Sequence, residues 1–440
     1  MPEDGWDYEN CSAIRYKGDD TGLKGTEDIT HYKDEMYFVS TGLYGGIVDD
    51  SNYDLGGIYT LDVSTTPPSF ERSEIYNMPA GSNFRPHGFD LDHDSNRLFV
   101  VSHNEQYSEE NIVIFTIDGT TTPPSFVFEV ALFSSDWIPI GSRSEAYHLN
   151  DVVYAGDGEI LTTQLGPMTP PADGNPNVPN PNPRYLYSCQ IPSNIESKIL
   201  ADGRLETICK PALNLPTTYG LNGVTIDDDK TTVWTSDVFH SQLLKIVKDK
   251  GEPPIIPENV AFERDVGVNF GWKLQNTIPT PGVVDNVEYM DGKLYMGFNG
   301  RTEGILSGST LPWVGGFLVG EELVAVGQGG SQDFSLGVRL QVGFQFTRNF
   351  LEKLGDPFGT SSAIPVGSDG QYLVLGSYDF PGLVLCDKNV MKEDSLSDED
   401  VSSGEEDTLS KDTATMKMSL KQLLVAGMVT FATALVMTLC

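Results

Sequence analysis

The chain is poor in positive charge, in histidine and in cysteine. Its 440 residues include 28 Lys and Arg against 63 Asp and Glu, which gives a formal net charge of -35. Binding to a phosphate backbone requires clustered basic side chains, so this charge argues against nucleic acid as a partner. An acidic chain is instead compatible with divalent cations. Only 6 His and 5 Cys are present, so the position of each one carries information.

Long stretches with helical periodicity are also scarce, which argues against all-α and doubly wound folds. The chain contains 45 Gly and 27 Pro, a composition that suits many short strands joined by turns. Its length is ample for a sizeable core. The predicted fold class is therefore all-β.

A turn-and-strand unit recurs six times in the chain. Each unit begins with Asp and continues into a short run of β-branched and aromatic residues. The units start at Asp34, Asp94, Asp157, Asp229, Asp291 and Asp369. Counting seven positions back from the first four reaches Glu27, His87, Asn150 and Asn222, and counting six and five back from the fifth reaches Asp285 and Asn286. Polar groups that recur at one phase of a repeat predict a shared site.

The length of the repeat leaves room for four short strands and their turns, which is one blade of a β-propeller. Six units predict a six-bladed closed ring in which the innermost strands line a central tunnel. The polar residues at the starts of those strands would then be neighbours around one axis. The alternative is that these stretches are ordinary hairpin turns and strand caps of another all-β protein.

The cysteines suggest how such a ring could close. Cys11 precedes the first unit and Cys386 ends the last, so a bond between them would clip the ring shut over nearly the whole chain. Cys189 and Cys209 could form a second bridge within one blade. Free buried thiols remain the alternative, because connectivity does not follow from sequence. Asn10 begins a glycosylation sequon, Asn-Cys-Ser.

The C-terminal part differs from the rest. We predict a propeller domain over residues 10–390, an acidic stalk and spacer over 391–422, and a hydrophobic anchor or GPI-attachment signal over 423–440. The last segment has 18 uncharged residues, near the minimum for spanning a bilayer. A polar spacer before a terminal hydrophobic tail is typical of GPI attachment. Three Lys residues precede the segment and none follows it, an arrangement that also permits a tail-anchored protein.

The N-terminus, PEDGWDYENC, has no apolar region of the kind that a signal peptide contains. We expect a processed or incomplete start. Calcium at high concentration and stable disulfides both belong outside the cytosol. The predicted location is therefore the extracellular face of a membrane, or secretion if the anchor is lost.

Several segments of the chain resemble the paraoxonase/arylesterase family. In order, they are GTEDI from Gly25, FRPHGFD from Phe84, FVVSH from Phe99, HLNDVV from His148, GLNGVTI from Gly220, VVDNV from Val283 and LVLCDK from Leu383. They follow the order and approximate spacing of the family over residues 10–388. The resemblance implies a six-bladed propeller with two calcium ions in its tunnel.

By this resemblance, one ion is catalytic and the other structural. The ligands implied for the catalytic ion are Glu27, Asn150, Asn222, Asp285 and Asn286. Those implied for the structural ion are Asp28, Asp151 and the backbone carbonyl of Phe89. Oxygen donors of mixed charge suit a hard cation such as calcium. Because neighbouring strand residues point in opposite directions, we expect adjacent ligands to serve ions at different depths. For any one of these residues the alternative is a turn or strand-cap role.

The reaction implied is hydrolysis of lactones and, less selectively, of aryl esters. Calcium would polarise the carbonyl, His87 would act as general base on water, and His103 would orient His87 and share its proton. Asp285 could also position or activate water. The expected partner is thus a small lipophilic lactone or ester.

The chain also departs from the family. The N-terminal hydrophobic helix of the family has no counterpart here, so lipoprotein binding is doubtful, and membrane attachment would come from the C-terminal anchor. A proline-rich segment from Gly166 replaces the active-site helix of the family. Arg85 and Ser102 stand where the family has asparagines.

Two other functions fit part of this pattern. A sugar lactonase of the related propeller superfamily would share the acidic and amide ligands, but it would lack the histidine segments and the terminal cysteine pair. A non-catalytic propeller on the cell surface would bind calcium structurally and present loops to partners. An open metal position with both histidines favours the enzyme.

Overall fold

The chain forms β-strands and two short 3-10 helices in the computed structural model, and the residues it describes contain no α-helix. It divides into two units, Met1–Asn389 and Val390–Cys440. All described residues belong to the first unit: 8–14, 25–42, 56–80, 82, 84–103, 110–133, 149–165, 184–191, 199, 203–215, 218, 220–249, 271–280, 283–290, 292–299, 314–319, 322–326, 330–333, 339–342, 361–377 and 382–388.

The first three sheets follow one another along the chain. The first has the order β2 (Thr26–Lys33), β3 (Met36–Thr41), β4 (Gly57–Asp62) and β5 (Ser69–Arg72). The second runs through β7 (Pro86–Asp92), β8 (Arg97–His103), β9 (Glu110–Asp118) and β10 (Ser125–Phe133), and β6 (Ile75–Tyr76) and β14 (Arg204–Glu206) pair with β10. The third comprises β11 (Leu149–Gly156), β12 (Glu159–Gln164), β13 (Arg184–Gln190) and β15 (Ile208–Leu215).

Three more sheets complete the set. The fourth contains β16 (Leu221–Ile226), β17 (Thr232–Asp237), β18 (Gln242–Lys248) and β19 (Trp272–Pro279), with helix η3 (Val238–His240) after β17. The fifth contains β20 (Val283–Met290), β21 (Lys293–Asn299), β22 (Val314–Val319), β23 (Glu322–Val326), β25 (Arg339–Val342) and β24 (Gly330–Asp333). The sixth contains β26 (Ser362–Val366), β27 (Tyr372–Gly376), β28 (Leu383–Lys388) and β1 (Tyr8–Ile14), with helix η4 (Ser368–Gly370) after β26.

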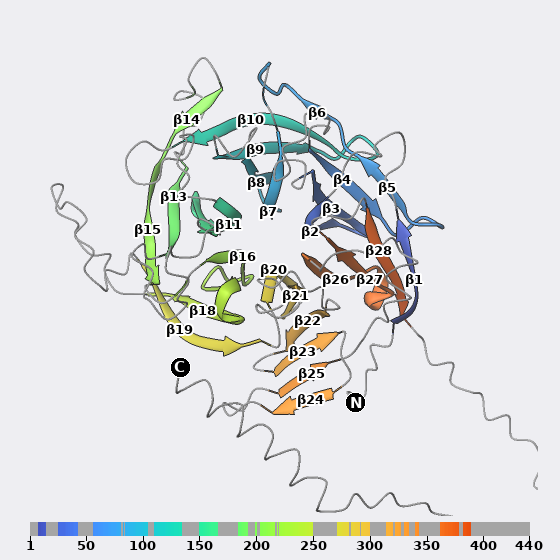
Figure 1. Cartoon of the computed structure of the whole chain (residues 1–440). Helices are drawn as coiled ribbons and strands as arrows, with labels where there is room; N and C mark the ends of the chain where they lie inside the picture. The colour runs from blue at the N-terminus through green and yellow to red at the C-terminus, as the bar shows by residue number, and fades with distance from the viewer. Residues whose placement is uncertain are drawn as a thin grey trace, which may run out of the picture. The chain divides into compact units, whose positions relative to one another are not determined.

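The sheets lie around a common centre, with the first strand of each sheet innermost and later strands farther out (Figure 1). The inner strands are β2, β7, β11, β16, β20 and β26. Strand β1 joins the outer edge of the sheet formed by β26 to β28, so the two ends of this unit meet in one sheet. The predicted all-β propeller is confirmed.

The blades are described to different extents. In five sheets all four strands of the meander have described side chains. In the sheet that begins with β20, side chains are described only in β20 and β21. The propeller is therefore defined blade by blade in five sheets, and a closed ring of six blades with a calcium tunnel stays a prediction.

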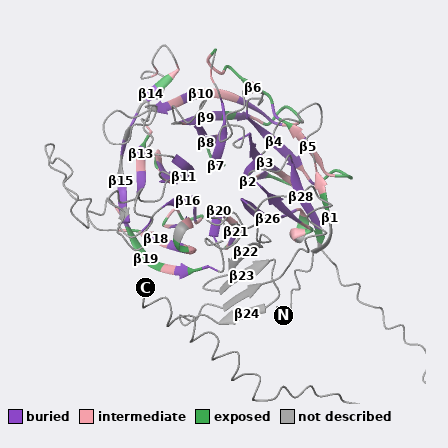
Figure 2. Ribbon diagram, in the orientation of Figure 1, coloured by how far each residue is buried: buried purple, intermediate pink, exposed green. Residues whose placement is uncertain are grey.

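The hydrophobic core lies between neighbouring sheets. Buried residues fill the inner and middle strands, as Figure 2 shows. Aromatic pairs cross three of the interfaces: Phe38 and Phe126 in a T-shaped contact, Phe99 stacked on Tyr154, and Trp234 stacked on Tyr289. Fully burying a side chain such as Phe38 or Phe126 contributes about 1.5–3 kcal/mol, so the interfaces between blades hold the inner strands in place.

Five of the six inner strands share an irregularity near their start. The pairing register shifts between Thr26 and Ile29, Pro86 and Phe89, Leu149 and Val152, Leu221 and Val224, and Val284 and Val287. Strand β26 pairs with β27 without a shift. A β-bulge bends the strand and redirects its side chains. Each predicted pair of adjacent ligands lies inside such a bulge, so the placement of these ligands at different depths stays a prediction.

Two bulges contain glycine because the next blade leaves no room for a side chain. A Cβ at Gly88 would lie 2.1 Å from Oδ1 of Asp151, and a Cβ at Gly223 would lie 2.5 Å from the Cα of Asn286. Such distances are far inside van der Waals contact. The close approach of neighbouring bulges thus depends on these glycines.

We expect Gly223→Ala to lower the free energy of unfolding by about 1–3 kcal/mol or more. The added methyl group would meet backbone atoms, which cannot rotate away as a side chain can. Urea unfolding measures the loss. The matched control is Gly57→Ala, where the nearest atoms belong to the flexible end of Arg72. Equal effects of the two substitutions would show that the bulges are not tightly packed.

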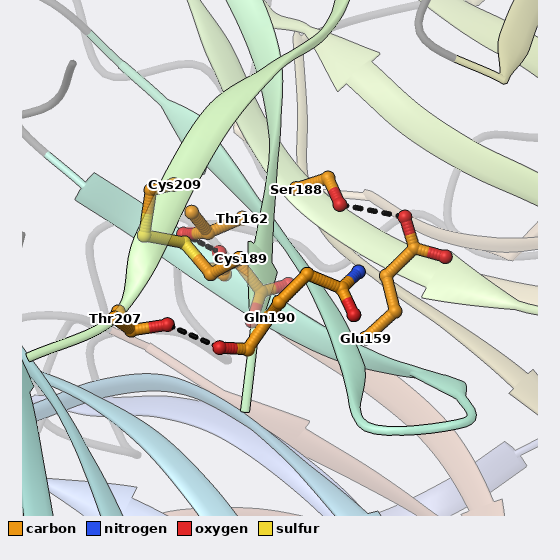
Figure 3. The surroundings of a disulfide bond; sticks show 8 residues. Glu159, Thr162, Ser188, Cys189, Gln190, Thr207 and Cys209 are labelled. Carbon is orange, nitrogen blue, oxygen red and sulfur yellow. Dashed lines mark hydrogen bonds between the residues drawn. A yellow bond between two sulfur atoms is a disulfide. The ribbon is translucent and has the colours of Figure 1, made fainter. Parts of the chain in front are cut away.

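One of the two predicted disulfides is present between described residues. Cys189 in β13 and Cys209 in β15 form a disulfide that joins cross-strand neighbours (Figure 3). Cys386 is disulfide-bonded, and Cys11 is its Cα partner in the ladder between β1 and β28. The side chain of Cys11 lies outside the described set, so the Cys11–Cys386 bond stays a prediction that this register favours.

Several predicted features lie outside the described residues. They are the proline-rich segment from Gly166, the stalk 391–422 and the hydrophobic segment 423–440. Within the described part, no helix has the length and apolar character needed to cross a membrane. The anchor, the glycosylation of Asn10 and the cellular location stay predictions.

Candidate functional site

The bulges of the first three blades meet around His87. Its Nε2 lies 3.4 Å from Oε1 of Glu27 and 3.3 Å from Nδ2 of Asn150. All three side chains are buried. Residues 27, 87 and 150, which the repeat placed at one phase, are thus direct neighbours.

The fourth and fifth blades supply the remaining predicted ligands. Asn222 donates from Nδ2 to Oδ1 of Asp285, and Asn286 donates from Nδ2 to the backbone oxygen of Glu27, 2.6 Å away. The backbone oxygen of Asp285 accepts a hydrogen bond from Ser236. These contacts connect the predicted ligands in two groups, one around Glu27 and the other formed by Asn222 and Asp285.

The three amide oxygens of this cluster have no hydrogen-bond partner among the described residues. They are Oδ1 of Asn150, Oδ1 of Asn222 and Oδ1 of Asn286, all buried. Leaving a buried acceptor unsatisfied costs about 1–3 kcal/mol, so three such atoms in one cluster require an explanation. Together with the carboxylates of Glu27 and Asp285 they form a set of hard oxygen donors. The donor chemistry fits a calcium ion.

No group of three or more His, Cys, Asp or Glu placed to hold a metal occurs among the described residues. This is consistent with the donor set, because three of its five members are amides. An ion held here would depend on Asn side chains rather than on a cluster of acids.

His87 and His103 form a hydrogen-bonded pair. Nδ1 of His87 lies 2.8 Å from Nε2 of His103, and both rings are buried. The amide nitrogen of Asn150 can only donate, so Nε2 of His87 is its acceptor and carries no proton in this arrangement. Nδ1 of His87 then holds the ring proton and donates it to His103. The ring thus presents a basic nitrogen to the cluster and a protonated one to its partner.

Glu27 is held by residues that the sequence analysis missed. Ser361 donates to Oε2 of Glu27 at 3.2 Å, and Ser362 donates to its backbone oxygen at 2.8 Å. Burial raises the pKa of Glu27 from 4.5 to about 7, and the bond from Ser361 opposes this rise. A nearby cation would favour the ionised carboxylate. Counting seven positions back from Asp369 reaches Ser362, so the repeat itself held the signal.

The two acids predicted for a structural ion connect neighbouring blades. Asp28 accepts the backbone N–H of Ile29 at 2.9 Å and that of Phe89, in the next blade, at 3.0 Å. Asp151 likewise accepts the N–H of Val152 and of Val224, each at 2.7 Å. Both carboxylates therefore have a structural role, which sequence did not indicate. Each oxygen keeps a further lone pair that could bind a cation.

Burial dominates the electrostatics of these acids. It raises the pKa of Asp28 to about 7, against the hydrogen bonds from Phe89 and Ile29. It also raises the pKa of Asp151 well above its usual value, and the nearby charge of Asp28 adds to the effect. Glu288 extends this acidic region, since burial and the charges of Asp28 and Asp90 raise its pKa as well. Asp28, Asn286 and Glu288 line one small cavity.

A second acid–histidine pair lies at the end of β17. Nδ1 of His240 is 2.6 Å from Oδ2 of the fully buried Asp237, and Gln242 donates to the same oxygen at 2.9 Å. The hydrogen bond to Asp237 raises the pKa of His240 above 6.5. The interaction therefore stabilises the fold when His240 is protonated.

This pair predicts a pH-dependent contribution to stability. The contribution is complete below the unfolded pKa of 6.5 and is lost as pH rises through the higher folded value. The side chain of His240 is 37% exposed, so we expect less than about 1 kcal/mol. Unfolding free energies of the parent chain and His240→Gln, measured from pH 5.5 to 8.5, should converge as pH rises. A pH-independent difference would contradict the assignment.

Comparison with known proteins finds one family that matches the N-terminal part of the chain. The arylesterase family matches residues 9–126, which include Glu27, Asp28, His87, Phe89 and His103. The family that the sequence resembles thus matches this part of the chain. Asn150, Asn222, Asp285 and Asn286 lie beyond it. No curated protein matches the chain.

Solved structures similar to this chain include three named proteins. A luciferin-regenerating enzyme is 12% identical over 87% of this chain and 95% of its own, with a TM-score of 0.43. The periplasmic gluconolactonase of Pseudomonas aeruginosa is 13% identical over 87% and 98%, with a TM-score of 0.41. The calcium-binding regucalcin of Agrobacterium tumefaciens is 11% identical over 84% and 91%, with a TM-score of 0.40. Likenesses this weak carry no argument about function.

Proposed function

We propose that this chain is a calcium-dependent hydrolase of lactones and, less selectively, of aryl esters. The observation that carries the proposal is the set of three buried amide oxygens without partners beside two carboxylates. The match of residues 9–126 to the arylesterase family supports it.

Glu27, Asn150, Asn222, Asp285 and Asn286 would hold the catalytic calcium. Two of these ligands are charged and three are neutral, so the ion would keep a net positive charge. Bound there, calcium would polarise the substrate carbonyl and stabilise negative charge that develops on its oxygen. Asp28, Asp151 and the carbonyl of Phe89 would hold a second, structural ion. The six sheets would then form one closed ring around both.

The chain's own residues would move the proton. Nε2 of His87 carries the lone pair of the ring and lies beside Glu27 and Asn150, where it would accept a proton from water in place of the bond from Asn150. The resulting hydroxide would attack the carbonyl carbon, and the bond between that carbon and the ring oxygen would break. While Nε2 is protonated, the Nδ1 proton of His87 would be shared with His103, 2.8 Å away. The released alkoxide would take the proton back from Nε2, which gives the hydroxy acid and restores the histidine pair. Asp285 would help to position the attacking water.

Hydrolysis of a lactone panel tests the proposal. The full chain should hydrolyse aliphatic and aromatic lactones with millimolar calcium, lose the activity on chelation and regain it with calcium. Asp285→Ala should not regain it. Calcium binding without turnover on any lactone or aryl ester would favour a non-catalytic surface propeller. Turnover confined to sugar lactones would favour a sugar lactonase.

The C-terminal part belongs to the same proposal. Residues 391–422 would form a polar stalk, and residues 423–440 an anchor or GPI-attachment signal that places the propeller at the extracellular face of a membrane. Phase partitioning of the expressed protein in detergent, before and after treatment with a phospholipase specific for GPI, separates the two modes of attachment. Release into the aqueous phase by the phospholipase would identify a GPI anchor.

A further inference from the structure

Arg85 occupies a fixed place beside the histidine pair. Its backbone N–H donates to Oγ of Ser102 at 3.2 Å, and its carbonyl oxygen accepts the N–H of His103 at 3.0 Å. Pro86 follows it, which favours an extended backbone at Arg85. Arg85 thus stands two residues before His87, directly ahead of the inner strand β7.

The surrounding chain restricts this segment further. A Cβ at Gly56 would lie 2.6 Å from Cδ of Pro86 and 3.2 Å from Cα of Arg85, so the residue just before β4 packs directly against this segment. Contacts on both sides hold the backbone of Arg85. The guanidinium therefore starts from a rigid base, as a recognition residue requires.

The guanidinium is buried but has no acidic partner among the described residues. Arg85 is 8% exposed, and its Nε and Nη1 are buried without hydrogen-bond partners. Basic side chains elsewhere in the described chain do pair with acids, as Arg97 does with Glu129 and Lys248 with Glu159. Arginine stays charged in proteins, and burying such a charge without a partner is strongly unfavourable. The arrangement calls for an anion from outside.

The geometry of arginine limits what that anion can be. A guanidinium presents parallel N–H groups that match the two oxygens of a carboxylate. The carboxylate of Glu27 contacts His87 and Ser361. Because Arg85 is two residues from His87 and its carbonyl oxygen accepts the N–H of His103, an anion held by its guanidinium would lie near the ester or lactone that His87 is proposed to act on. We propose that Arg85 is a specificity-determining residue that binds a carboxylate substituent of the substrate. This inference rests on the proposed hydrolase function.

A pair of substrates that differ only in charge tests the assignment. The pair is 5-oxotetrahydrofuran-2-carboxylate and its neutral carboxamide, offered to the full chain with calcium. We expect the carboxylate to have the higher kcat/KM, by about 10- to 100-fold, the range for hydrogen bonds to a charged group. Arg85→Gln should bring the ratio close to one, and Arg85→Lys should retain part of it.

Arg97→Gln is the matched control, because it removes the same charge from the far end of β8, where Arg97 pairs with Glu129. It should keep the parental ratio. The inference is overturned if Arg85→Gln keeps the ratio too, or if Arg85→Gln changes only inhibition by the ring-opened 2-hydroxyglutarate. The second outcome would mean that the residue binds the product carboxylate and not the substrate.

Binding of the intact carboxylate lactone, followed by calorimetry in the parent and Arg85→Gln, separates this inference from the proposed function. If neither lactone is hydrolysed but binding weakens at least tenfold in Arg85→Gln, the hydrolase proposal fails and the anion site stands. Equal binding in both proteins overturns the anion site whatever the activity.

Discussion

Calcium at 100 times its dissociation constant is expected to raise the free energy of unfolding by about 2.7 kcal/mol. The physical reason is the cluster of buried amide oxygens of Asn150, Asn222 and Asn286, which have no hydrogen-bond donor within the described chain. An ion that binds them in the folded state has no equivalent site in the unfolded chain. Urea unfolding with calcium and with chelator measures the difference.

Asn222→Ala should reduce this calcium-dependent gain to less than about 1 kcal/mol, because one ligand is lost and Asp285 loses the bond from Nδ2 of Asn222. The matched control is Asn276→Ala in β19 of the same sheet, where the amide oxygen accepts a local bond from Thr277 at an exposed position. The control should keep the full gain. A gain of equal size in Asn222→Ala would place the ion elsewhere.

His87→Gln is expected to lower kcat/KM for lactone hydrolysis by about 10²- to 10⁴-fold, the usual contribution of a general base. Calcium-dependent stabilisation should persist, because His87 is not among the proposed ligands. Steady-state rates at saturating calcium, combined with unfolding curves, separate the two effects.

His103→Gln should cause a smaller loss than His87→Gln, since His103 acts through Nδ1 of His87. His93→Gln provides a control, because this exposed histidine follows the same strand, β7, but takes no part in the cluster. Equal losses in all three variants would mean that the substitutions disturb the fold rather than the chemistry. Full activity in His87→Gln would rule it out as the base.

Many of the site residues could be predicted from the sequence because each blade repeats the same pattern. A constant offset between Glu27, His87, Asn150 and Asn222 and the following Asp turn places each residue at the same point of its blade. Ring geometry then makes them neighbours, as the contacts of His87 show. The same count from Asp369 would have reached Ser362, whose contact with Glu27 was missed.

Other features did not follow from residue patterns. The bulges at the starts of five inner strands come from how one strand pairs with the next, and a pattern of polar residues does not specify register. The carboxylates of Asp28 and Asp151 accept backbone N–H groups of the following blade, Phe89 and Val224, which are distant in sequence. Such contacts depend on the placement of whole blades.

The amino-acid sequence alone thus determined the all-β class, the phase of the repeat and the identity of the polar residues at the centre, because these depend on local periodicity and turn chemistry. The tertiary structure decided which of those groups satisfy one another and which do not. Within the part of the chain that the structure describes, it left the amide oxygens of Asn150, Asn222 and Asn286 and two guanidinium nitrogens of Arg85, Nε and Nη1, without partners. The reason is physical: a hydrogen bond requires two atoms at about 3 Å, and only packing of the blades sets that distance.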